Sequence, residues 1–112
     1  MLNHVYSCCL LDLDALPITV EVDITRGLPN IVIVGLPDNA VKESKERVRA
    51  AIKNNGYSFP AQRITVNLSP AHIKKEGPLL DLPIAIGILA SSGKISPEAL
   101  KRFVFAGELS LD

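Results

Sequence analysis

The chain has 112 residues, and its acidic and basic side chains balance to a formal net charge of zero at neutral pH. This length fits a single domain over residues 1–112, and 47% apolar residues supply a core that needs no disulfide or metal. No apolar run reaches the roughly 18 residues of a membrane-spanning helix, and the first residues lack the charge of a secretory leader. We therefore expect a cytoplasmic protein with no membrane partner.

The balanced total hides an uneven distribution of charge. Residues 1–41 carry a net charge of −4, residues 42–75 carry +6, and residues 76–112 carry −2. Only the middle third is therefore expected to attract an anionic partner.

Three strands are predicted to open the domain. Residues 5–11 form the first, and residues 18–24 alternate apolar and polar side chains, which predicts a strand with one buried face. A turn at residues 27–29 leads to the β-branched run at residues 31–34. Such a run predicts a strand that is covered on both sides or lies in the centre of the sheet.

A helix and a fourth strand are predicted next. Asp38 is a suitable N-cap for a helix that runs to about Asn54, with Gly56 available to end it. Residues 63–68 alternate again and predict a strand that ends at Ser69-Pro70.

The last part of the chain is predicted to hold two helices and a strand. Asp81 is expected to cap a buried helix that is apolar nearly all round and stops at Ser92-Gly93. Ser96-Pro97 opens a short helix, and residues 103–106 predict a final strand. The order β-β-β-α-β-α-α-β favours an α/β domain of the two-layer α+β kind, with helices packed on one face of a mixed sheet.

The sequence offers little catalytic chemistry. It has no Gly-Lys-Ser/Thr segment of the kind that binds nucleotide phosphates, so this chain is not expected to hydrolyse ATP by that route. Cys8 and Cys9 are adjacent, and His4 and His72 have no partner at ligand spacing, which predicts neither a disulfide nor a metal site. The spacing of Asp12 and Asp14 could suggest a pair of catalytic acids, but a solvated acidic strand edge near a turn accounts for them equally well. We assign no catalytic residue and no cofactor to this chain.

One helix face is a candidate contact for nucleic-acid phosphates. Its basic residues fall within a narrow arc away from the apolar face, and further charge follows in the loop before the second helix, with Arg47 and Arg63 nearby. The alternative is a solvated face in which Glu43 and Glu46 balance the charge, because no aromatic residue interleaves the basic ones. The candidates are Lys42, Lys45, Arg49, Lys53, Lys74 and Lys75.

Ordered motifs lie along nearly the whole chain. They are Thr19-Val20-Glu21-Val22-Asp23-Ile24, Gly35-Leu36-Pro37-Asp38, Glu46-Arg47-Val48-Arg49-Ala50-Ala51-Ile52, Asp81-Leu82-Pro83-Ile84-Ala85-Ile86-Gly87 and Gly107-Glu108-Leu109-Ser110-Leu111-Asp112. Together they resemble one family, and the chain is similar to the N-terminal domain of the magnesium-chelatase-like AAA+ ATPases of the ComM/YifB type.

The resemblance implies a Lon-protease-like fold joined downstream to an AAA+ module that binds ATP and magnesium. It also implies a hexameric parent that acts as a DNA branch-migration helicase in recombination and natural transformation. Lon-type proteases carry their nucleophile in a Gly-Pro-Ser segment, and the matching residues here are Gly77-Pro78-Leu79, where leucine has no nucleophilic atom.

Three functions are consistent with these observations. The first is a non-catalytic domain that organises the ATPase and contacts DNA. The second is a protein-interaction module whose exposed edge strand recruits a partner, and the third is a vestigial Lon-type peptidase. A Walker A motif encoded beyond residue 112 is expected under the first.

Overall fold

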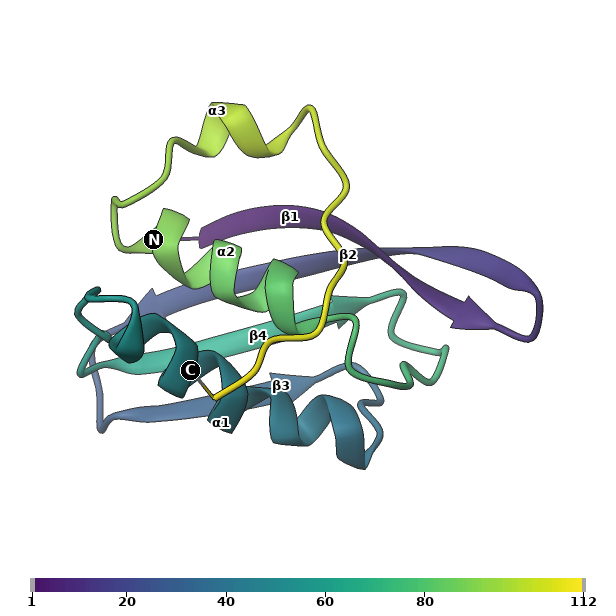
Figure 1. The fold of residues 1–112 in the computed structure, drawn as a ribbon, viewed down its shortest axis with the longest axis horizontal. Coiled ribbons are helices and arrows are strands. Elements are labelled where there is room, and N and C mark those ends of the chain that lie inside the picture. The colour runs from purple at the N-terminus through teal and green to yellow at the C-terminus, as the bar shows by residue number, and fades with distance from the viewer. Residues whose placement is uncertain (1, 112) are drawn as a thin grey trace.

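A four-stranded mixed sheet forms one layer of the domain in the computed structural model, which describes residues 2–111 (Figure 1). The spatial order of its strands is β1-β2-β4-β3, in which β2 pairs antiparallel with both β1 and β4, and β3 pairs parallel with β4. The strands are β1 (Leu2–Leu11), β2 (Asp14–Thr25), β3 (Asn30–Val34) and β4 (Arg63–Ser69).

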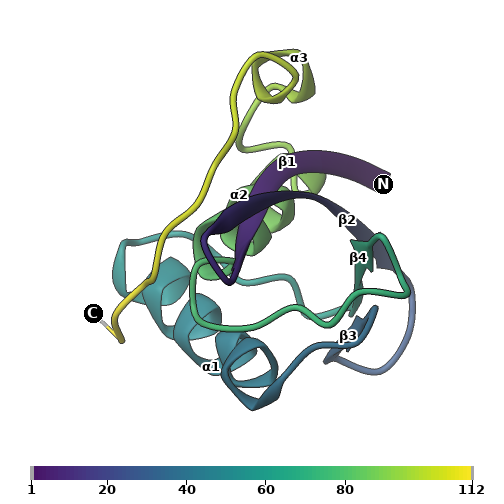
Figure 2. The same cartoon turned by 90° about the vertical axis from the view of Figure 1, so that its right-hand side faces the viewer.

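The helices form the second layer. Figure 2 shows that α1 (Asn39–Asn54) and α2 (Asp81–Ser91) lie on the same side of the sheet, which curls around α2. The short α3 (Pro97–Leu100) lies beyond α2, beside β1. The predicted two-layer α+β architecture is confirmed. No helix within residues 2–111 has the length and apolar character needed to cross a membrane.

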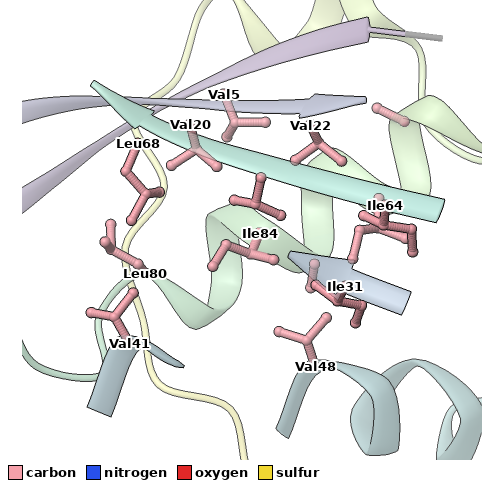
Figure 3. Packing of buried hydrophobic residues seen from close by; sticks show 14 of the residues in the cluster. Val5, Val20, Val22, Ile31, Val41, Val48, Ile64, Leu68, Leu80 and Ile84 are labelled. Atoms are coloured by element: carbon pink, nitrogen blue, oxygen red, sulfur yellow. The ribbon is translucent and has the colours of Figure 1, made fainter. Parts of the chain in front are cut away.

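The core lies between the two layers (Figure 3). Alternate residues of β2 and β4 point into it, as the period-two pattern predicts. They meet one stripe of α1 and most of α2. Close approach of α2 to β2 depends on Gly87, where an added Cβ would overlap a methyl group of Val22. The largest apolar members include Ile18, Val20, Val22, Ile64, Leu68, Leu80, Ile84 and Ile88.

Both ends of α1 follow the sequence prediction. The Asp38 side chain accepts a hydrogen bond from the Val41 amide at 2.8 Å and so caps the helix. At the other end Gly56 has φ +85°, and its amide and that of Tyr57 donate to Lys53 and Ile52, each at 3.1 Å. This is the Schellman arrangement, in which a glycine in the left-handed region ends a helix.

Three predictions about this fold are wrong. Residues 103–106 form no strand, because only Val104 makes a bridge to β1, opposite Tyr6. Residues 103–111 instead form an extended segment, here called the strap. The β-branched run of β3 lies at an edge of the sheet, with Val34 exposed, and not at its centre. Asp81 lies inside α2, whose N-cap position is Leu80.

The strap crosses the helix layer towards α1 (Figures 1 and 2). The Gly107 amide donates to the Leu79 carbonyl at 2.8 Å, and the Leu82 amide donates to the Gly107 carbonyl at 3.0 Å. Near its end, Asn54 Nδ2 donates to the Leu111 carbonyl at 2.6 Å. The strap is therefore tied to both main helices.

Candidate nucleic-acid interface

Four of the six candidate basic residues line two adjoining grooves between α1 and the free edge of β3. Lys42 and Lys45 line the first, together with residues 30–33, and its volume is about 260 Å³. Arg49 and Lys53 line the second, together with the start of β3 and residues 59–62, and its volume is about 340 Å³. The helical spacing seen in the sequence thus places Lys42, Lys45, Arg49 and Lys53 in one row along the strand, here called the basic row.

Acidic neighbours balance only part of this charge. Glu46 Oε1 lies 3.8 Å from Arg49 Nη1, and Glu43 pairs at 3.8 Å with Arg47, which is outside the row. Within residues 2–111, the lysines of the row form no ion pair. Among the described residues, Arg49 therefore has a carboxylate within ion-pair distance, and the three ammonium groups of the row have none.

An aromatic ring lies next to the basic row in the folded chain, although no aromatic residue lies between the basic residues in the sequence. The Arg49 guanidinium lies over the Phe59 ring, 5.6 Å from its centroid. Phe59 is half-buried and lines the same groove as Lys53. Phe59 follows Arg49 by ten positions and lies beyond the end of α1, so helical spacing could not have identified it. Arginine guanidinium groups and aromatic rings are both groups on which a base can stack.

Arg47 belongs to a buried ionic network and not to the surface patch. Its Nε donates to Asp81 Oδ2 at 2.6 Å, and its Nη2 donates to the Ala40 carbonyl at 2.8 Å. The Asp81 carboxylate is fully buried and also accepts from Ser44 Oγ and from the Leu109 amide of the strap. The hydrogen bond to Asp81 raises the pKa of Arg47. This network joins α1, α2 and the strap through a single carboxylate.

The structure removes Lys75 from the candidate set. Its side chain is fully buried, and Nζ donates to the carbonyls of Gly35, at 2.7 Å, and Pro70. Its backbone also bridges to Leu36 and Asp38, at 2.9 Å each. An ammonium group enclosed in this way cannot reach a phosphate. Lys74 is exposed in the same loop but lines neither groove.

Burial of Lys75 predicts a pH effect on stability. Desolvation lowers the pKa of Lys75 in the folded chain, so the folded chain loses this proton at a lower pH than the unfolded chain. Between the two pKa values the unfolded chain binds more protons, and the contribution of Lys75 to stability rises with pH. We expect the urea midpoint of wild type to rise, relative to that of Lys75→Met, as alkaline pH approaches the ordinary lysine pKa. A constant difference would contradict this.

Residues 77–79, which the resemblance described above aligns with the nucleophile segment of Lon-type proteases, precede α2. The Gly77 amide donates to Asp38 Oδ2 at 3.1 Å, and Leu79 is half-buried with its carbonyl bonded to the strap. This segment therefore helps to join the start of α1 to the strap.

Comparison with known proteins identifies the family. Residues 20–112 match the family model of subunit ChlI of magnesium chelatase. The chain is 49% identical to YifB of Escherichia coli over 98% of its length, and 49% identical to the competence protein ComM of Haemophilus influenzae over 96%. A Mycobacterium bovis protein is 43% identical over 99% of the chain. The chain spans about a fifth of the length of these relatives, 21–22%.

The family model covers the end of β2, β3, β4, both main helices and the strap, and therefore includes the basic row and the Asp81 network. A sequence identity of 49% across nearly the whole chain is far above the identity that a shared fold alone produces. This chain belongs to the magnesium-chelatase-like family that includes YifB and ComM.

Proposed function

We propose that this chain is a non-catalytic accessory domain of a longer magnesium-chelatase-like ATPase, and that its basic row contacts DNA. The relationship to the competence protein ComM, together with the family resemblance described above, supports a role in handling DNA. The single observation that carries the DNA contact is the row of uncompensated lysines along the free edge of β3.

The geometry of the row suits a phosphate backbone. Lysines at positions 42, 45 and 53 extend along one helix, and each can neutralise a phosphate and release its counterions. Arg49 and Phe59 line the same groove as Lys53 and add two groups on which bases can stack. Single-stranded or branched DNA, whose bases are accessible, is the form that this combination favours.

DNA binding is expected to depend steeply on salt. With three or four phosphate contacts, log affinity for single-stranded DNA should fall with log salt at a slope of about −2 to −3. Lys42→Ala should flatten this slope by about 0.7, because one contact is lost. Fluorescence anisotropy of a labelled oligonucleotide at several salt concentrations measures both quantities.

Lys101→Ala is the matched control for this prediction. Lys101 is exposed but lies outside the row and pairs with Glu98 at 3.3 Å, so its loss should leave the slope unchanged. Binding that is insensitive to salt, or a Lys101→Ala effect equal to that of Lys42→Ala, would contradict the proposed contact.

The accessory role is tested in the longer protein. We expect the gene to encode a Walker A motif beyond residue 112, with ATP and magnesium bound by that downstream module, which is the intramolecular partner of this domain within a hexamer. Charge reversal of the row should lower DNA-stimulated ATP hydrolysis while basal hydrolysis persists. A stop codon directly after residue 112 would contradict the proposal.

A further inference from the structure

The two edges of the sheet differ in how they are covered. The outer edge of β1 is partly covered by the strap, because the Phe105 amide donates to the Tyr6 carbonyl at 2.9 Å and Val104 bridges to the same residue. Among residues 2–111, β3 at the other edge has a strand neighbour on one side only, which is β4. Exposed apolar edge strands pair readily with added strands, and proteins usually cover or interrupt them. The edge of β3 is therefore open to an added strand.

The surroundings of β3 define what could bind there. Residues 31–34 are all β-branched, and the lysines at 42 and 45 line the adjacent groove without an ion pair in the described chain. A complementary partner must be extended, must present apolar side chains, and must carry negative charge.

The hairpin formed by β1 and β2 meets these requirements. Pairing of β2 with β4 begins only at Thr19, so in the described part of the chain residues 14–18 have a strand partner on the β1 side alone. Figure 1 shows the hairpin projecting past the ends of β3 and β4. Its tip, defined here as residues 10–14, holds two aspartates and no basic residue. Its leucines at positions 10, 11 and 13 are 61%, 50% and 100% exposed.

We propose that the hairpin of one copy docks on the β3 edge of a second copy, where residues 14–18 extend the sheet and the tip places Asp12 and Asp14 against Lys42 and Lys45. This docking would cover the exposed leucines of the tip in one copy and the open edge of β3 in the other copy. Because the tip and the β3 edge are different surfaces, the contact is head-to-tail, and repetition generates a ring or an open chain. The contact does not require DNA, although both would use the same lysines and should compete for them.

A charge-swap experiment on this 112-residue chain tests the docking. In sedimentation velocity at low salt, wild type should form larger species whose fraction grows up to about 1 mM protein and falls as salt is added. Asp12→Lys/Asp14→Lys and Lys42→Glu/Lys45→Glu should each weaken association about tenfold or more, because like charges then face each other. An equimolar mixture should associate again, since each variant offers the charge that the other lacks.

Each other outcome counts against the docking. Wild type that stays monomeric up to about 1 mM overturns it, as does a mixture that fails to associate. Leu13→Ser should also weaken association, and Leu13 is fully exposed, so folding should be retained. Leu2→Ser is the matched control, because Leu2 is 52% exposed at the other end of β1. Equal effects of the two leucine variants would contradict the assigned surface.

DNA binding by the same variants separates this inference from the proposed function. Asp12→Lys/Asp14→Lys should lose self-association but retain DNA binding, whereas Lys42→Glu/Lys45→Glu should lose both. Self-association with charge-swap rescue but no DNA binding would overturn only the proposed function. Salt-dependent DNA binding by a chain that remains monomeric would overturn only the docking.

Discussion

Asp81→Ala is expected to destabilise the folded chain by about 3–5 kcal/mol, the usual cost of removing one partner from a buried ion pair. The carboxylate is fully buried and accepts hydrogen bonds from Arg47, Ser44 and the Leu109 amide. Without it, a half-buried guanidinium loses its counter-charge and two further donors lose their acceptor. Urea unfolding followed by circular dichroism measures the change.

A double-mutant cycle makes the Asp81 result specific. Arg47→Ala should also be destabilising, and the double variant should cost clearly less than the two single changes added together, because the residues act as one unit. If Asp81→Ala does not fold, Asp81→Asn retains an acceptor oxygen and can take its place in the cycle. Glu98→Ala, which breaks an exposed pair with Lys101, should leave stability unchanged. Additive effects at Asp81 and Arg47 would refute the network.

Gly35→Ala is expected to cost about 3 kcal/mol of folding stability, since two penalties combine at this position. Gly35 has φ +104°, a conformation that side chains disfavour. An added Cβ would also overlap the carbonyl oxygen of Leu68 in β4. Because that oxygen belongs to the backbone of a central strand, it cannot move aside without disturbing the sheet.

Gly56→Ala separates the two penalties at Gly35. Gly56 has φ +85°, but an added Cβ there would meet no atom within 4 Å. Its substitution should therefore cost only the conformational term, about 1 kcal/mol. The difference between the two variants measures the clash with Leu68. Equal losses of stability would show that the close approach of Gly35 to β4 is unimportant.

Local sequence patterns correctly predicted the strands that bury one face and the start of the first helix. The alternation in residues 18–24 and 63–68 and the cap at Asp38 required no knowledge of the tertiary fold. The extension of β2 back to Asp14 was missed because Pro17 indicates a break in a strand. Pro17 lies in the part of β2 that pairs with β1 but not with β4. Proline is tolerated at such an edge position because its missing amide hydrogen leaves no partner unsatisfied there.

The rest depended on contacts between distant parts of the chain. Nothing near Asp81 in sequence indicates that its carboxylate binds Arg47, 34 residues away, instead of capping its own helix. The sequence around Lys75 indicates an exposed residue in a polar loop. In the folded chain its ammonium group is buried and donates to the carbonyls of Gly35 and Pro70. Helical spacing correctly gathered the lysines of α1 but contained no information about Phe59.

The strap also determines how mechanical force enters the domain. Tension applied at residue 111 would act first on the contacts with Asn54 and Asp81, and therefore on the helices, before any hydrogen bond between strands was stretched. Asn54 directly follows Lys53 in α1, so this pull would reach the end of the helix that carries one lysine of the basic row.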